Sequence, residues 1–161
     1  MATVGDTLPQ GTLFEMTADG PQKVESGPLF ENRTIALFGV PGAFTPTCHN
    51  NHMPSFVRAA EDLSAKGVDE IICVSVNDPF VMGQWGEITG AKEAGIRLLA
   101  DADGSFTKAL GLDFDGSVVG LGVRAKRFSA LIGNGTIKIL NVEDNPGEAS
   151  CTLGEALVDQ I

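Results

Sequence analysis

The stretch Gly39-Val-Pro-Gly-Ala-Phe-Thr-Pro-Thr-Cys48 decides the organisation of the chain. A continuous apolar run, Ile35–Phe38, leads into it, which is typical of a buried strand. Pro41 ends that strand, and Pro46 suits the first turn of a helix, where its missing N–H costs no hydrogen bond. Outward-pointing N–H groups and the helix dipole favour an anion at such a crossover, and the thiolate is the reactive form of cysteine. We therefore interpret Cys48 as a nucleophile.

The composition fits one globular domain, residues 1–161, with room for a full hydrophobic core. The formal charge of −10, from 11 basic and 21 acidic residues, argues against a nucleic acid or an anionic membrane as partner. No apolar run approaches the ~20 residues of a membrane span, and the N-terminus lacks a signal-peptide pattern. We expect a cytoplasmic protein, or one of an organelle matrix or stroma if a transit peptide has been removed.

The three cysteines, Cys48, Cys73 and Cys151, are too widely spaced to predict a framework of structural disulfides. His49 and His52 follow Cys48, but no second cysteine pair accompanies them at metal-site spacing. We therefore expect no metal and no cofactor.

The rest of the chain alternates between strand and helix patterns. Strands are expected over 34–40, 68–77, 96–100, 124–132 and 136–142, and helices over 46–66, 79–94, about 105–110 and 152–161. Before them, residues 1–33 indicate short strands or a hairpin and a single turn, and residues 111–122 look irregular. Pro54 should kink the first long helix, and Gly133-Asn-Gly135 predicts a hairpin. The pattern predicts an α/β fold with a central mixed sheet flanked by helices and an N-terminal extension.

Polar residues surround Cys48, namely Thr45, Thr47, His49, Asn50 and Asn51, whereas a cysteine that only packs a core would have apolar neighbours. The Thr45 hydroxyl is spaced to reach back towards the sulfur, and Pro41 would shield the site. His52 would orient the main chain or pair with an acidic side chain. A role as the general base for Cys48 is only one option, because a thiol that is already ionised needs no base.

A basic stretch, Arg124-Ala-Lys-Arg127, opens a later strand of this acidic chain. One interpretation is a solvated turn. The other is that Arg127 points at the thiolate, favours its charge and aligns a polar substrate oxygen.

The motif Pro41-x-x-x-Thr45-x-x-Cys48 resembles the active site of the peroxiredoxins, which are thiol peroxidases on a thioredoxin-like fold. The strings His52-Met-Pro-Ser-Phe, Val74-Ser-Val-Asn-Asp-Pro-Phe-Val-Met and Trp85-Gly extend the resemblance to the type II, or peroxiredoxin-five, subfamily over essentially the whole chain. It implies that Cys48 is the peroxidatic cysteine, that Pro41, Thr45 and Arg127 activate it, and that Thr45, Thr47 and Arg127 bind substrate.

The resemblance also implies a catalytic cycle. Cys48 attacks a hydroperoxide and becomes a sulfenic acid, which a thiol traps as a disulfide and which thioredoxin, glutaredoxin or glutathione returns to the thiol. Cys151, in a polar loop, resembles the resolving cysteine of animal peroxiredoxin-five proteins, which form an intramolecular disulfide. Cys73 resembles a cysteine of plant-like members, but it lies in an apolar strand that would have to unfold locally to reach Cys48. We therefore expect Cys151 to resolve, with Cys73 or a one-cysteine mechanism as alternatives.

The family further implies a homodimer formed through the face near the active site. Its candidate contacts are Phe44, Phe80, Met82 and Trp85, which would otherwise pack the core or line a pocket.

Two other functions compete with the peroxidase. A thioredoxin-type oxidoreductase lacks support because no Cys-x-x-Cys pair is present, whereas a redox relay to a partner protein would use the same sulfenic acid.

Overall fold

A seven-stranded sheet with the strand order β2-β1-β5-β4-β3-β8-β9 forms the centre of the computed structural model, which describes residues 1–161. Its strands are β1 (Thr12–Thr17), β2 (Gly20–Glu25), β3 (Thr34–Val40), β4 (Glu70–Ser75), β5 (Arg97–Ala100), β8 (Phe128–Gly133) and β9 (Thr136–Val142). The three central strands β3, β4 and β5 are parallel, and the strands outside them pair antiparallel. The predicted mixed sheet is confirmed, with the N-terminal hairpin as one edge.

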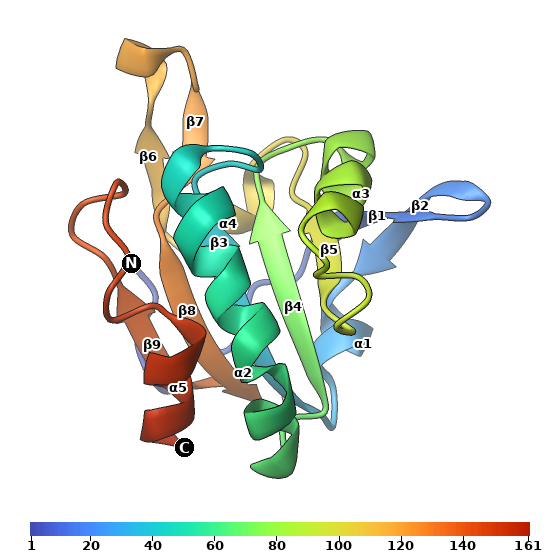
Figure 1. The fold of residues 1–161 in the computed structure, drawn as a ribbon, viewed down its shortest axis with the longest axis vertical. Coiled ribbons are helices and arrows are strands. Elements are labelled where there is room, and N and C mark those ends of the chain that lie inside the picture. The colour runs from blue at the N-terminus through green and yellow to red at the C-terminus, as the bar shows by residue number, and fades with distance from the viewer.

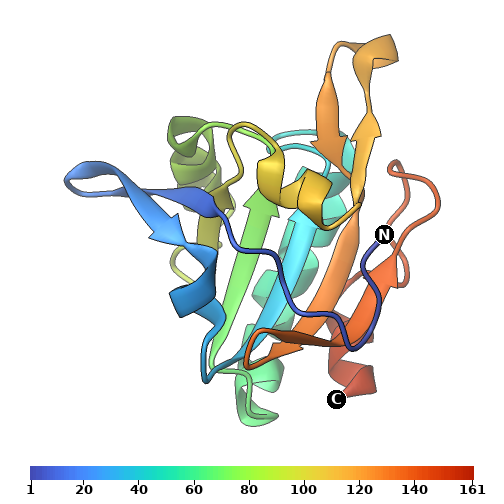
Figure 2. The same cartoon turned by 180° about the vertical axis from the view of Figure 1, so that it is seen from behind.

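Helices cover both faces of the sheet. On one face lie α2 (Met53–Ala65), α3 (Pro79–Ile88) and α5 (Gly154–Gln160) (Figure 1). On the other lie α1 (Ser26–Phe30) and α4 (Ser105–Ala109), and the N-terminal segment crosses that face (Figure 2). Each face has its own buried apolar cluster, so the sheet is apolar on both sides, as the continuous runs in β3 and β4 predicted. No helix is both long and apolar enough to cross a bilayer.

The carboxyl ends of β3 and β4 meet at one edge of the sheet, and the antiparallel strand β8 begins there. Gly39 of β3 lies opposite Phe128, the first residue of β8. A Cβ at Gly39 would lie 2.0 Å from the Phe128 ring, so only glycine allows this approach. The pairing places the residue before Phe128, which is Arg127, beside the end of β3.

The helix after β3 is helical from Pro46, passes through a π-helical turn at Cys48–His52 and continues as α2. Within the turn, the N–H of Met53 donates to the carbonyl of Cys48. Pro54 offers no N–H to the preceding turn, so the irregularity lies directly before the proline that predicted one. The backbone N–H of Cys48 has no acceptor within the chain and remains available to a ligand.

The expected helix 79–94 is too long, because α3 ends at Ile88. The Thr89 hydroxyl donates to the Trp85 carbonyl at 2.7 Å, and Gly90 has a φ of 76°, a left-handed conformation that ends helices. Residues 90–95 form turns instead.

The segment 111–122, expected to be irregular, contributes to a second small sheet. Strands β6 (Asp113–Asp115) and β7 (Val123–Ala125) pair antiparallel around a 3₁₀ turn at Ser117–Val119, and this hairpin projects from the body (Figure 1). The expected strand 124–132 is therefore two strands, β7 and β8, in different sheets. The break leaves Lys126 and Arg127 outside both.

We predict that Gly154→Ala destabilises the fold, because α5 approaches α2 through this glycine. A Cβ at Gly154 would lie 2.6 Å from the Ser55 carbonyl oxygen, which is main chain and cannot rotate away. We expect a loss of about 1–3 kcal/mol in the free energy of unfolding by urea. Gly11→Ala is the matched control, since its nearest neighbour, a Phe106 ring carbon, is 4.0 Å away. Equal effects of the two substitutions would contradict the prediction.

Candidate active site

Cys48 and Arg127 meet at the carboxyl edge of β3. The Nη2 atom of Arg127 donates to the Cys48 sulfur at 3.2 Å, and both residues are buried, with exposed fractions of 0% and 1%. A guanidinium at this distance favours the charged form of a thiol. The structure therefore supports the interpretation in which Arg127 points at the thiolate. The alternative, that this residue lies in a solvated basic turn, is wrong.

The guanidinium is held by two further contacts. Nη2 also donates to the carbonyl of Pro146 at 2.9 Å, and Nη1 lies 3.1 Å from Nδ1 of His52. The Nε atom is buried and has no partner. These contacts fix the plane of the guanidinium over the sulfur, so little reorganisation is needed when charge develops there.

His52 connects Arg127 to the C-terminal part of the chain. Its Nε2 atom lies 2.8 Å from the carbonyl oxygen of Thr152. A carbonyl only accepts and a guanidinium only donates, so the proton lies on Nε2 and Nδ1 accepts from Arg127. Burial, together with the charge of Arg127, lowers the pKa of His52 to about 3. His52 is thus a neutral bridge; it contacts no carboxylate, and its Nδ1 is already occupied, which argues against the general-base option.

We predict that this histidine makes the fold acid-sensitive. Its pKa is about 3 in the folded state and 6.5 when unperturbed, so the unfolded chain binds more protons below pH 6.5. The free energy of unfolding should therefore fall by about 1.2 kcal/mol between pH 6 and 5 from this group. The measurement is the free energy of unfolding by urea at several pH values, for the wild type and for His52→Gln. The other histidine, His49, is present in both proteins, so a difference in pH slope reports on His52. An identical pH slope in the two proteins would contradict it.

The loop between Pro41 and Thr45 is ordered by contacts outside Cys48. The N–H of Ala43 donates to Asn77 Oδ1 at 3.0 Å, and the Thr45 hydroxyl donates to the Gly42 carbonyl at 2.7 Å. Thr45 therefore makes no hydrogen bond to the sulfur here, contrary to the expected contact. Its oxygen keeps its acceptor capacity, because only its proton is used.

Pro41 and Thr47 both precede Cys48 in the chain, and each makes a contact with a different later segment. Pro41 is buried at the end of β3, and its carbonyl accepts from Arg124 Nη1 at 3.3 Å. Thr47 does not present its hydroxyl to the sulfur; it donates to the carbonyl of Gly147 at 2.8 Å. The contact ties the helix of Cys48 to the loop that carries Cys151.

The other two thiols lie in contrasting environments. Cys73 is fully buried in β4, opposite Phe38 of β3, and burial raises its pKa well above the usual range, with a further increase from the charge of Cys48. Cys151 is exposed, and partial burial followed by the charge of Glu143 raises its pKa. All three cysteines are free thiols in the structure.

The four expected dimer contacts divide into two pairs. Met82 and Trp85 are fully buried, and the Trp85 indole N–H donates to His49 Nδ1 at 3.0 Å, so these two pack the interior, and their expected place at an interface is wrong. Phe44 and Phe80 are 45% and 66% exposed. Phe44 has a φ of 66°, a strained conformation for a bulky residue.

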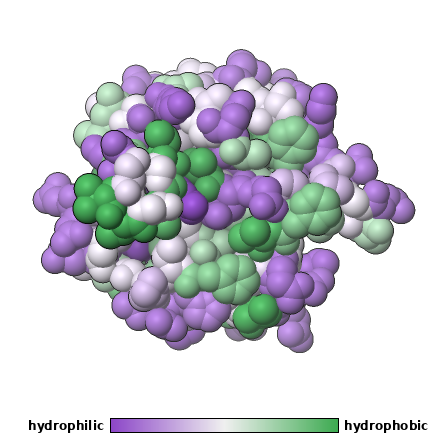
Figure 3. Space-filling view, turned by 90° about the horizontal axis from the view of Figure 1, so that it is seen from above, coloured by the Kyte–Doolittle hydropathy of each residue, from purple (hydrophilic) through white to green (hydrophobic).

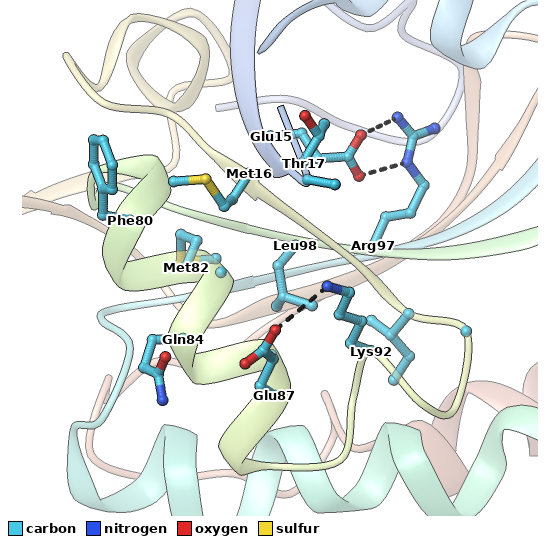
Figure 4. A pocket seen from close by; sticks show the side chains of 15 residues that line it. Glu15, Met16, Thr17, Phe80, Met82, Gln84, Glu87, Lys92, Arg97 and Leu98 are labelled. Atoms are coloured by element: carbon cyan, nitrogen blue, oxygen red, sulfur yellow. Dashed lines mark hydrogen bonds and ion pairs between the residues drawn. The ribbon is translucent and has the colours of Figure 1, made fainter. Parts of the chain in front are cut away.

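A cavity of about 730 Å³ lies between β1 and α3, away from this site. Its charged residues are already paired, Glu15 with Arg97 and Glu87 with Lys92 (Figure 4). Neither Cys48 nor Arg127 lines it, so it is not part of the active site.

Sequence reasoning missed the C-terminal half of the site. Pro146, Thr152 and Glu143 all contribute contacts to this network, and none belongs to a recognisable motif. The only available signal was their position in the polar loop that also carries Cys151. Arg124, which was noted only as part of the basic stretch, contacts the Pro41 carbonyl.

Comparison with known proteins extends these observations. The model of the redoxin family matches residues 3–157. Peroxiredoxin-2D of Arabidopsis thaliana is 45% identical over 160 residues, which cover 99% of this chain and 98% of the relative. The structure of reduced Prx3 from Vibrio vulnificus in complex with H₂O₂ has a TM-score of 0.93 at 44% identity, covering 99% of both chains. Peroxiredoxin 5 from Alvinella pompejana has a TM-score of 0.85 at 32% identity, covering 98% of this chain and 96% of the other.

A buried cysteine held under an arginine, at the edge of a thioredoxin-like sheet, defines a thiol-dependent peroxidase. The chain belongs to the redoxin family and, within it, to the type II peroxiredoxins. Cys48 is its peroxidatic cysteine, in an active site that contains Arg127.

Proposed function

We propose that the enzyme reduces hydrogen peroxide and organic hydroperoxides, and the observation that carries this is the 3.2 Å contact between Arg127 and the Cys48 sulfur. The thiolate attacks the terminal oxygen of the hydroperoxide. A sulfur–oxygen bond forms, the O–O bond breaks, and the leaving alkoxide takes a proton from solvent. The products are the Cys48 sulfenic acid and an alcohol, or water when the substrate is hydrogen peroxide.

The donors around Cys48 suit the charge that develops in this step. The free backbone N–H of Cys48 and the guanidinium of Arg127 stabilise negative charge on the peroxide oxygens. The Thr45 hydroxyl, which donates its hydrogen bond to the Gly42 carbonyl, accepts a hydrogen bond from the hydroperoxide and so orients the terminal oxygen towards sulfur. Pro41 shields the sulfur from bulk water, and Thr47 supports the site through the loop that it binds.

We assign resolution of the sulfenic acid to Cys151, which attacks the Cys48 sulfur, releases water and leaves an intramolecular disulfide. Three observations favour it over Cys73. Cys151 is the exposed thiol, and its loop is bound to the Cys48 helix through Thr47 and Gly147. Cys73 would have to leave the β3–β4 ladder. Because Cys48 is fully buried, attack by the exposed Cys151 requires the π-helical turn of Cys48 to open.

Mapping of disulfides by mass spectrometry after one equivalent of peroxide tests this assignment. We predict a Cys48–Cys151 disulfide in the wild type and an accumulated Cys48 sulfenic acid in Cys151→Ser. Cys73→Ser is the matched control and should still form the disulfide. A Cys48–Cys73 disulfide contradicts the assignment, and a lone sulfenic acid or glutathione adduct in the wild type indicates one-cysteine chemistry. A mixed disulfide with another protein would indicate the relay role in redox signalling.

The reductant, the assembly and the compartment belong to the same proposal. We assign reduction of the disulfide to thioredoxin, or to glutaredoxin with glutathione, and a homodimer to the face that holds Phe44 and Phe80. Both phenyl rings are exposed, and the end of the molecule drawn in Figure 3 carries several apolar patches among polar residues. We place the protein in the cytoplasm, although one relative, 46% identical over 96% of this chain and 70% of its own length, is named chloroplastic.

A further inference from the structure

We propose that Glu143 is a positioning residue of the peroxidatic site, which holds Arg127 on Cys48 through Thr152 and His52. The inference rests on the roles of Cys48 and Arg127 given above. It adds a residue that lies in none of the active-site motifs and contacts neither the sulfur nor the substrate.

Glu143 is a buried carboxylate with an exposed fraction of only 7%. Its Oε1 accepts from the N–H of Ser150 at 2.6 Å and from the N–H and hydroxyl of Thr152 at 3.1 and 2.9 Å. Its Oε2 accepts from the Ser150 hydroxyl at 3.2 Å. Burial raises the pKa of Glu143, but these hydrogen bonds outweigh it and hold the pKa below its usual range. A permanent anion therefore fixes the backbone at Thr152.

Thr152 passes this constraint to Cys48. Its carbonyl accepts from His52 Nε2 at 2.8 Å, His52 Nδ1 accepts from Arg127 at 3.1 Å, and Arg127 Nη2 donates to sulfur at 3.2 Å. Each contact allows only one direction of donation, so the position of the Thr152 carbonyl fixes the tautomer of His52, and the tautomer leaves a lone pair for Arg127.

The fold keeps Glu143 and Arg127 in register independently of their side chains. Phe128 pairs with Val142 across β8 and β9, and the N–H of Glu143 donates to the carbonyl of Arg127 at 3.0 Å. The anion and the cation thus lie at adjacent ends of one antiparallel pair, with neutral His52 as the bridge between them. Every residue in this series, from Glu143 to Cys48, is buried, so water cannot replace a lost contact. Loss of Glu143 should therefore change the position of Arg127 relative to the Cys48 sulfur.

The test uses Glu143→Gln, which keeps the shape of the side chain and removes its charge. Glu148→Gln is the matched control, because it removes the same charge from an exposed position of the same loop. The readout is the rate of Cys48 sulfenic acid formation in a single turnover, trapped with dimedone. This step precedes resolution, so it does not depend on whether Cys151 or another thiol resolves.

We expect about a tenfold slower step in Glu143→Gln, a loss typical of groups that orient a functional side chain, and no change in Glu148→Gln. A second readout is the ¹⁵N spectrum of His52, in which the single Nε2–H tautomer of the wild type should become a mixture. In a His52→Gln background, Glu143→Gln should cost much less than in the wild type, because its route to the sulfur has been removed.

Unchanged kinetics and an unchanged His52 tautomer in folded Glu143→Gln would overturn the proposal, as would an equal cost in the His52→Gln background. If Glu143→Gln does not fold, Thr152→Val tests the same proposal. It removes only the hydroxyl that donates to Glu143 and keeps the carbonyl, so a smaller loss of rate with a disturbed tautomer is expected, and a wild-type spectrum and rate would overturn the proposal.

Discussion

Cys48→Ser should abolish peroxide reduction, with a loss of at least about a thousandfold in kcat/KM, as found when an enzyme loses its nucleophile. A serine hydroxyl remains protonated at neutral pH, and the neighbouring groups accept or donate hydrogen bonds but cannot accept an oxygen atom. The measurement is peroxide consumption with an excess of a chemical thiol reductant, so that the identity of the natural reductant does not matter.

The controls for this variant are the other two thiols. Cys73→Ser and Cys151→Ser should both still form a sulfenic acid at Cys48 after one equivalent of peroxide. Cys48→Ser itself should fold, because a hydroxyl can accept from Arg127 in place of the sulfur. Substantial peroxide consumption by Cys48→Ser, or loss of sulfenic acid in Cys73→Ser, would show that the nucleophile has been misassigned.

The parts of the fold that were predicted correctly depend on local patterns. The apolar runs of β3 and β4, the Gly133-Asn-Gly135 hairpin and the glycine after α2 each act within a few residues. Their alternation was enough to predict the mixed sheet. The π-helical turn was predicted in part. Pro54 indicated an irregularity in the helix, but the sequence did not indicate its π-helical form or its position at Cys48–His52.

The errors have two physical origins. The end of α3 depends on a local contact, in which the Thr89 hydroxyl donates to the Trp85 carbonyl, whereas the division of 124–132 depends on the pairing of β7 with a separate strand, β6. In the site, Arg127 was recognised because it lies in a basic stretch of an acidic chain. His52 was noticed beside Cys48, but its partner, the Thr152 carbonyl, is 100 residues away, and no pattern within either segment indicates it.

Arg127→Ala should slow sulfenic acid formation by about a hundredfold or more, the usual cost of removing one donor that stabilises developing charge. The variant leaves the Pro146 carbonyl and His52 Nδ1 without their partner in a buried site. A lower stability should therefore accompany the slower reaction, and the fold must be checked by circular dichroism at the assay temperature.

Arg127→Lys separates the charge of this residue from its shape. A lysine keeps the positive charge, and so should recover part of the rate of sulfenic acid formation that Arg127→Ala loses. Its single ammonium nitrogen cannot occupy the positions of both Nη1 and Nη2, so it cannot contact His52 and the sulfur in the same arrangement. We therefore expect sulfenic acid formation that is faster than in Arg127→Ala but still about tenfold slower than in the wild type, a size typical of a lost orienting contact. Full recovery of the rate would mean that Arg127 acts as a point charge alone, and a rate as low as that of Arg127→Ala would mean that the forked geometry of the guanidinium is essential.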